Sequence, residues 1–270
     1  MTPVTEPDET AADETQTPLH LPVAPISTDQ VRPLVLAAAA VGAVLLAVGA
    51  MTGYAAGLGV AVVLALVLAG TWPWAGGSVT PGQTSLVLGA SALLVVASAV
   101  RDDLRWVAAA VAFGVVASFF HQLLRAPGRE GLVLSLLASF GGLVLVASLA
   151  TMVALLHQAG MSGFVVVAMA ALVAALLADL LGRSSALRPY LSVVALVAAL
   201  VVVLVVAVWF DRVTMLDAAG LGAAVGTVSW SFRRVMSGQP AILGARGQVA
   251  AGLGSVFAVG AIVHLYGVIS

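Results

Sequence analysis

Long apolar runs alternate with short polar breaks along the chain from residue 33 to its end. The hydrocarbon core of a bilayer is about 30 Å thick, and a helix of about 20 residues crosses it at about 1.5 Å per residue. A helix satisfies its own backbone hydrogen bonds inside lipid, so each run is expected to be α-helical. The pattern predicts nine spans, at 33–52, 54–71, 83–100, 106–124, 132–156, 163–181, 190–210, 216–232 and 248–268.

The predicted fold is therefore all-α, a polytopic transmembrane helix bundle of about nine spans joined by short loops. Two features leave eight spans as an alternative. The turn at 51–54 is tight, and the span at 216–232 is short and rich in glycine. Losing or merging one span would move the C-terminus to the other side of the membrane.

The composition supports a membrane protein and excludes several other classes. Hydrophobic residues make up 61% of the 270 positions and charged residues 9%, whereas soluble domains carry roughly 25% charged residues. A soluble globular domain, a disordered chain and a nucleic-acid-binding domain are excluded. The chain has no cysteine and no lysine, which excludes disulfides, Cys-bound metals, Schiff-base chemistry and a P-loop. No cofactor and no metal site are expected.

Residues 1–31 differ from the rest of the chain. They hold six of the twelve acidic residues and five of the eleven prolines, without apolar periodicity. This composition predicts a disordered acidic cytoplasmic tail, followed by one transmembrane domain over 32–270. The tail lacks the basic segment of a signal peptide, so the first span is expected to remain as an anchor. It is either a solvated leader or a docking segment for a basic partner.

The arginines indicate the orientation. Loops on the cytoplasmic side carry an excess of basic residues. With nine spans and the N-terminus inside, eight arginines fall on the inner side and three on the outer side. The chain is therefore expected in the cell (plasma) membrane with its N-terminus in the cytoplasm and its C-terminus outside. The inner set is Arg32, Arg125, Arg129, Arg183, Arg188, Arg233, Arg234 and Arg246, and the outer set is Arg101, Arg105 and Arg212.

One cluster of candidate site residues lies where the fourth span meets the cytoplasm. His121 and Arg125 are four residues apart and share a helix face. Arg129 and Glu130 follow a Pro-Gly turn and stand at the start of the next helix, whose N-terminus carries partial positive charge. Together they are a candidate site for an anion, such as a lipid head group. Alternatively, the arginines are positive-inside anchors and Glu130 is a carboxylate at a helix start.

Two ionisable residues lie within predicted spans. Asp179 is about one turn from the cytoplasmic end of the sixth span, and Arg183 at i+4 can pair with it. A carboxylate at that depth either forms an interfacial ion pair or binds a proton or cation. His264 lies in the last span near the outer face. It is either hydrogen-bonded between helices or part of a proton relay.

Small and aromatic residues mark expected packing and interface positions. Gly222 and Gly226 have small-xxx-small spacing, which lets helices approach closely in lipid. Trp72 and Trp74 fall at the predicted end of the second span and are expected to act as aromatic anchors at the interface.

A short motif carries a resemblance to a known group of proteins. His121-Gln-Leu-Leu-Arg125, followed by Gly128-Arg129, resembles a motif of actinobacterial multispanning membrane proteins that lack an assigned activity and are sometimes labelled permeases. The resemblance covers one helix end and the general hydropathy, and it implies no catalytic residues. The span count is also similar to that of CDP-diacylglycerol synthases. Residues 233–270 contain neither Lys nor Asp, so the C-terminal signature of those enzymes is missing.

Three functions are compatible with these features. The first is a permease-like protein for a small apolar or lipidic substrate, because ionisable residues are scarce within the spans. The second is a structural or assembly subunit of a cell-envelope complex, with a membrane-protein partner. The third is a lipid-head-group enzyme at the His121 cluster, although the chain shows no nucleophile–base pair and few carboxylates. The expected partners are the bilayer, an anionic lipid and a membrane protein, and not nucleic acid; no enzymatic activity is expected.

Overall fold

The computed structural model describes residues 32–101, 103–124, 131–181 and 190–270, and these residues form helices without any strand. The all-α fold is therefore confirmed. The described helices are α1 (Pro33–Thr52), α2 (Tyr54–Ala75), α3 (Pro81–Ser98), α4 (Leu104–Leu123), α5 (Leu132–Leu155), α6 (Ser162–Leu181), α7 (Leu191–Ala207), α8 (Met215–Ser237), the 3-10 helix η3 (Pro240–Leu243), α9 (Ala245–Phe257) and α10 (Gly260–Ile269).

Several of these helices are suited to a membrane. Among the described residues, six helical segments are long and apolar enough to cross a bilayer: α1 to α5 and the α9–α10 segment over Ala245–Ile269. α6 and α7 provide shorter apolar stretches, and α8 carries Asp217, Arg233 and Arg234. The chain is an integral membrane protein with multiple apolar helices.

The helix bounds agree closely with the hydropathy pattern, with one exception. α1 begins and ends at the predicted residues, and α8 extends five residues beyond its predicted end. The predicted span 248–268 corresponds to one apolar segment, Ala245–Ile269, in which the helix is interrupted between Phe257 and Gly260. Hydropathy could not reveal this break, since the residues on both sides of it are apolar.

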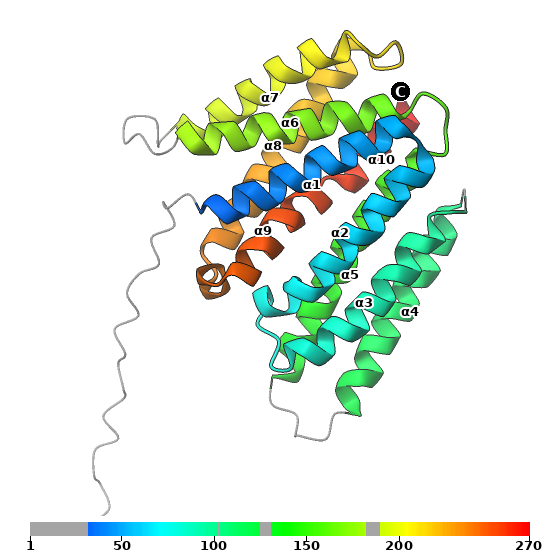
Figure 1. Ribbon diagram of the computed structural model, residues 1–270, viewed down its shortest axis with the longest axis vertical. Helices are drawn as coiled ribbons and strands as arrows, with labels where there is room; N and C mark the ends of the chain where they lie inside the picture. The colour runs from blue at the N-terminus through cyan, green and yellow to red at the C-terminus, as the bar shows by residue number, and fades with distance from the viewer. Residues whose placement is uncertain (1–31, 102, 125–130, 182–189) are drawn as a thin grey trace, which may run out of the picture.

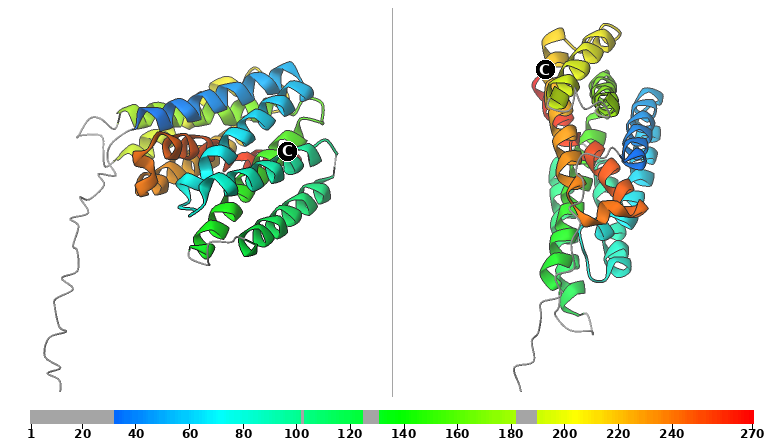
Figure 2. Two further views of the ribbon diagram at one scale, coloured as in Figure 1. Left: turned by 60° about the horizontal axis from the view of Figure 1, so that its bottom comes forward. Right: turned by 90° about the vertical axis from the view of Figure 1, so that its left-hand side faces the viewer.

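The helices pack side by side in a flattened bundle (Figure 1, Figure 2). The α3–α4 hairpin lies at one end, and α6, α7 and α8 lie together at the other. α1, α2, α5, α9 and α10 occupy the centre. α9 contacts α1, α2, α5 and α8, and α10 contacts α5, α6 and α8. The α9–α10 segment therefore joins the central helices to α6 and α8 at one end of the bundle.

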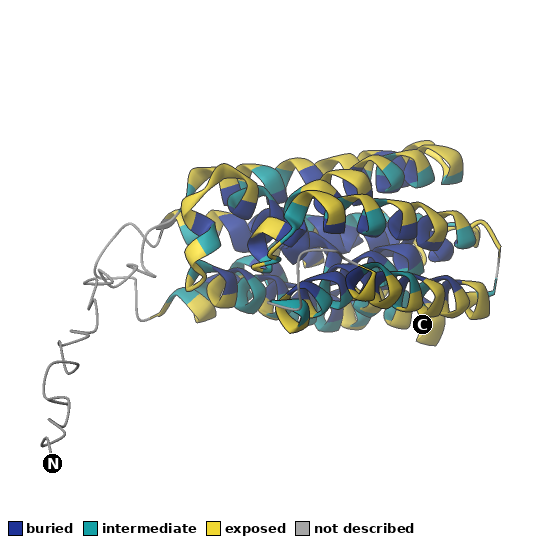
Figure 3. Cartoon of the chain, turned by 90° about the horizontal axis from the view of Figure 1, so that it is seen from below, coloured by how far each residue is buried: buried dark blue, intermediate teal, exposed yellow. Residues whose placement is uncertain are grey.

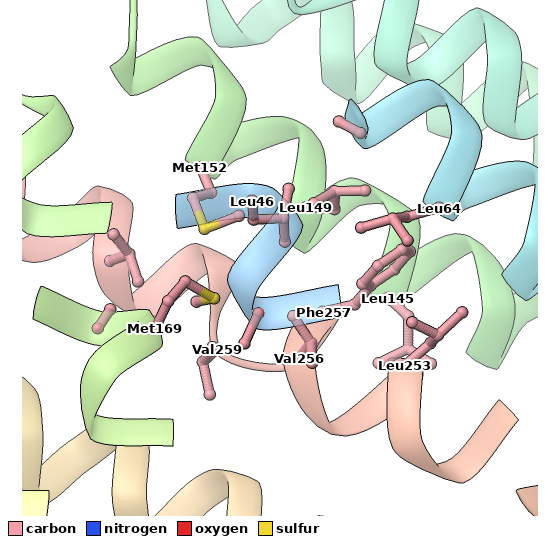
Figure 4. Close-up of a cluster of buried hydrophobic side chains, with 14 of the residues drawn as sticks. Leu46, Leu64, Leu145, Leu149, Met152, Met169, Leu253, Val256, Phe257 and Val259 are labelled. Atoms are coloured by element: carbon pink, nitrogen blue, oxygen red, sulfur yellow. The ribbon is translucent and has the colours of Figure 1, made fainter. Parts of the chain in front are cut away.

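The interior is packed with Ala, Val, Leu and a few larger side chains, and the outward faces are also apolar (Figure 3). Phe257 at the end of α9 is fully buried among side chains of α1, α2, α5 and α6 (Figure 4). On α7, Val197 and Val201 are more than half exposed. Apolar residues on every side of a helix suit a bundle that is surrounded by lipid rather than water.

Trp72 and Trp74 have different roles. Trp72 is buried, and its Nε1 donates to the Ala138 carbonyl of α5 at 2.8 Å. The prediction that Trp72 is an interfacial anchor is therefore wrong, and this residue joins α2 to α5 instead. Trp74 is 43% exposed and lies under the Arg246 guanidinium at 4.5 Å. That position agrees with an interfacial anchor.

Side chains cap the first turns of α4 and α8. Asp103 accepts a hydrogen bond from the Arg105 amide at 2.9 Å. This backbone hydrogen bond is the main reason that the pKa of the Asp103 carboxyl lies below its ordinary value. Thr214 accepts from the Asp217 amide at 3.1 Å and donates to its carboxylate at 2.6 Å. Both caps satisfy amides that a helix leaves unpaired at its start.

Candidate functional site

The predicted anion site is only partly within the described residues. Arg125, Arg129 and Glu130 lie outside them. His121 lies in the last turn of α4 and is half-buried. Its Nε2 atom is buried and has no hydrogen-bond partner among the described residues. The structure therefore places one of the four predicted residues and leaves their grouping untested.

A network of hydroxyl and amide groups lies beside His121, between α3, α4 and α5. Gln122 Nε2 donates to Thr84 Oγ1 at 3.3 Å, and Thr84 Oγ1 lies 2.9 Å from Ser78 Oγ. Ser78 Oγ donates to Ser135 Oγ at 3.2 Å, and the Val79 amide donates to the same oxygen at 3.3 Å. The network ties the loop before α3 to the beginning of α5.

Two members of this interface have buried polar atoms without a partner in the described part of the chain. These are Gln122 Oε1 and Ser118 Oγ, on residues only 3% and 0% exposed. Both lie on the face of α4 that packs against α3 and α5. Buried polar groups of this kind are commonly satisfied by water. The sequence contained a usable signal, because Ser118 and Gln122 are four residues apart and share a helix face.

Asp179 forms a buried ion pair with a partner that the sequence did not predict. Arg233 of α8 donates to Asp179 Oδ2 of α6 from Nε at 2.9 Å and from Nη2 at 2.7 Å. The side chains are only 6% exposed for Arg233 and 18% exposed for Asp179. The expected partner, Arg183, lies outside the described residues. The two residues lie on different helices and are 54 positions apart in the sequence, so i+4 spacing cannot reveal the pair.

A serine fixes the guanidinium of this pair. Arg233 Nη1 donates to Ser229 Oγ at 2.6 Å, one turn earlier on α8. Ser229 is fully buried. The carboxylate receives two charge-assisted hydrogen bonds, which are the stronger kind. This geometry favours the ion-pair interpretation of Asp179 over that of a proton- or cation-binding carboxylate.

The interruption of the last span is held by Ser148 of α5. Its hydroxyl donates to the Phe257 carbonyl at 2.6 Å and accepts from the Ala261 amide at 2.9 Å. One side chain therefore serves a carbonyl at the end of α9 and an amide at the start of α10. Backbone groups freed by a break at membrane depth require such a partner. The break lies about 20 Å along α9 and about 15 Å from the end of α10, at 1.5 Å per residue.

His264 lies on α10, one turn beyond the break. It is half-buried, and the backbone of Thr151 on α5 lies beside its ring. Its Nδ1 atom is buried without a partner among the described residues. Thr151 Oγ1 in turn donates to the Ser148 carbonyl at 2.8 Å. The structure thus brings His264 close to the break, through residues of α5 that the sequence did not single out.

His157 lies at the opposite end of the bundle from the Gln122 network. His157 Nε2 is 3.1 Å from the Ala99 carbonyl, and Tyr54 Oη donates to the same carbonyl at 3.3 Å. The rings of His157 and Tyr54 stack with centroids 3.9 Å apart. The contact joins the end of α3 to the start of α2 and to the loop after α5.

Comparisons with protein-family models, with curated proteins and with solved structures give no significant match. The described residues also contain no group of three or more His, Cys, Asp or Glu that could hold a metal ion. Function must therefore be argued from the geometry of the bundle.

Proposed function

We propose that this chain is a permease-like membrane protein that carries a small uncharged or lipidic substrate. The observation that supports it best is the discontinuous last span. A short break separates α9 from α10, and Ser148 lies beside it. Discontinuous helices near the middle of the membrane form the binding sites of many transporters. The break also lies at the centre of the bundle, where α5 contacts both half-helices.

The groups around the break indicate the substrate class. They are the Ser148 and Thr151 hydroxyls, backbone amides and carbonyls, and the His264 ring. None of these is a fixed charge. The charged pair Asp179–Arg233 is satisfied internally on α6 and α8. A site lined by neutral hydrogen-bonding groups and apolar side chains favours an uncharged or lipidic substrate.

The proposal includes an orientation with the N-terminus in the cytoplasm and the C-terminus outside. It rests on eight inner arginines against three outer ones, and on counting α1 to α8 and the α9–α10 segment as nine passes. Alkaline phosphatase fused after Ser270 is expected to be active, and green fluorescent protein at the same place is expected to stay dark. If the green fluorescent protein fusion is fluorescent and the alkaline phosphatase fusion is inactive, nine crossings in this orientation are contradicted.

Accessibility of the break tests the permease proposal directly. Because the chain has no cysteine, the variant Ser148→Cys carries a single thiol. A permeation path at the break predicts that membrane-impermeant maleimide labels this thiol in intact proteoliposomes. The matched control is Ala150→Cys, which is on the same helix and fully buried. It should be labelled only after denaturation in SDS. If maleimide labels neither thiol in intact proteoliposomes, the proposed permeation path at the break is wrong.

Flux measurements complete the test. Proteoliposomes are assayed for glycerol-driven swelling and for dithionite bleaching of an NBD-labelled phospholipid that has crossed the bilayer. We expect the wild type to accelerate one of the two over empty vesicles, and Ser148→Phe to reduce that rate at least about tenfold, a change of about 1.4 kcal/mol in barrier height. Rates equal to those of empty vesicles with both probes would overturn the proposed function.

A further inference from the structure

Buried polar atoms without a hydrogen-bond partner gather at one end of the α3–α4 hairpin. In the part of the chain that the structure describes, five such side-chain atoms occur, and four of them belong to α3 and α4. The four are Ser85 Oγ, Ser118 Oγ, His121 Nε2 and Gln122 Oε1. A single buried polar group without a partner is costly. Four of them in one place therefore point to a ligand that they share.

Two contacts fix the register of α3 against α4. Gln122 Nε2 donates to Thr84 Oγ1 at 3.3 Å. About two turns closer to the start of α4, a Cβ atom on Gly114 would lie 3.2 Å from Ser91 Oγ. The two helices therefore run antiparallel along the hairpin (Figure 1), with Thr84 opposite Gln122 and Ser91 opposite Gly114.

This register brings the four unpartnered atoms together. Ser85 and His121 each lie one residue from the first of these contacts, so they are level with each other. Ser118, His121 and Gln122 are spaced at i, i+3 and i+4 and share one face of α4. The helix rises only about 6 Å from Ser118 to Gln122, at about 1.5 Å per residue. The four atoms are therefore confined to a short stretch of the helix interface.

The stretch is buried and is closed toward the middle of the hairpin. Gln122 is 3% exposed and Ser118 is fully buried, and α5 packs against both α3 and α4. At Gly114, an added Cβ atom would lie 2.9 Å from Leu143 Cδ2 of α5 as well as close to α3. The three helices therefore leave no room for a ligand at that level. Bulk solvent is nearest at the other side, where α4 ends.

The chemistry of these atoms requires an uncharged ligand that both donates and accepts hydrogen bonds. Gln122 Oε1 can only accept, whereas the two serine hydroxyls can do both. α3, α4 and α5 contain no acidic residue, and their one arginine is Arg105, about 20 Å from Ser118 along α4. An ion in this site would therefore find no opposite fixed charge on these helices. Water has the required chemistry and is small enough for a helix interface.

We propose that the interface of α3, α4 and α5 binds a cluster of buried water molecules. Buried waters make about three hydrogen bonds each, so about two of them serve the four atoms. Gln122 belongs to both parts of the resulting network, because its Nε2 donates to Thr84 and its Oε1 receives from water. The cluster thus connects His121 with the hydroxyl groups at the start of α5. It is separate from the break at Ser148 and does not depend on the proposed permease function.

Water-edited solid-state NMR tests the cluster. The full-length protein with isotope-labelled histidine is reconstituted in phospholipid bilayers, and magnetisation transfer from water protons to the ring nitrogens is recorded. His121→Phe assigns the His121 signal by its loss. We expect rapid transfer to His121 in the wild type and its loss in Ser118→Val, which replaces the hydroxyl and fills the site. The matched control is Val116→Ala, at a 50% exposed position of the same helix, which should leave the transfer unchanged.

Two results of this experiment would overturn the proposal. One is a wild-type protein in which no magnetisation passes from water to the His121 ring. The other is transfer that Ser118→Val leaves as fast as in the wild type, because the water would then reach His121 from outside the helix interface.

The sign of a stability change gives an independent measurement. Ser118→Ala removes one hydroxyl, and if that hydroxyl binds water, the unfolding constant in SDS titration should rise about fivefold, the effect of one lost hydrogen bond. A hydroxyl without water gives the opposite result, because its removal relieves a buried polar group that has no partner. An unfolding constant that is unchanged or lower would contradict the water cluster.

Discussion

Replacement of Arg233 by Met is expected to lower the free energy of unfolding by about 3 kcal/mol. Removing one partner of a buried ion pair leaves an uncompensated charge, which costs about 3–5 kcal/mol. We expect the lower end of this range because Asp179 keeps 18% of its side-chain surface exposed. SDS titration of the protein in mixed micelles measures the change.

Two further variants separate this effect from a general loss of packing. Asp179→Leu combined with Arg233→Met removes both charges, and its stability should return to within about 1 kcal/mol of the wild type. Arg105→Met breaks the exposed Asp103–Arg105 pair, in which Arg105 is 92% exposed, and should leave the titration midpoint unchanged. A double variant as unstable as Arg233→Met would contradict the uncompensated-charge explanation.

Replacement of Gly260 by Ala is expected to destabilise the bundle by about 3 kcal/mol, at the upper end of overpacking costs. A methyl group on Gly260 would overlap the Ser148 carbonyl group of α5. The obstacle is backbone, so no side-chain rotation relieves it. α10 would have to move away from α5, and the hydrogen bond from the Ala261 amide to Ser148 would be lost.

Gly59→Ala is the matched control. A Cβ atom at Gly59 of α2 meets nothing within 4 Å, so this substitution should not lower stability and should raise it by up to about 1 kcal/mol, the difference in helix propensity between Gly and Ala. Both variants add one methyl group to a glycine within a helix of the same bundle. If Gly260→Ala unfolds at the same SDS fraction as Gly59→Ala, the close contact of α10 with α5 is wrong.

Hydropathy alone predicted most of the helix bounds. Each predicted span from 33–52 to 216–232 corresponds to one helix, and only the ends shift by a few residues. Apolar runs of this length have few alternatives inside lipid. Neighbouring helices could not be predicted in the same way, because apolar residues surround each helix and no face is marked for burial. The uniform hydrophobicity that identifies the class of protein also conceals its packing.

The candidate sites were less predictable for a related reason. Asp179 was identifiable as an intramembrane carboxylate, but its partner Arg233 is on another helix. The role of Ser148 could not be predicted from the sequence, because it depends on a break in α9–α10 that the apolar residues on both sides do not reveal. His121 was selected for its charge pattern, whereas the structure buries its neighbour Gln122 in the hydroxyl network. Short-range spacing detects contacts within a helix and misses those between helices.

The position of α9 and α10 has a consequence for biogenesis. α9 and α10 follow α1 to α8 along the chain and are synthesised after them, yet they occupy the centre of the bundle against α1, α2 and α5. Until they are inserted, α1 lacks its contact with α9, in which Gly252 lies close to the α1 backbone at Val35. The centre of the bundle therefore closes only after α9 and α10 have entered the membrane. A chain that is truncated before residue 245 would lack α9 and α10, which fill the centre of the bundle. We expect membrane proteases to degrade it.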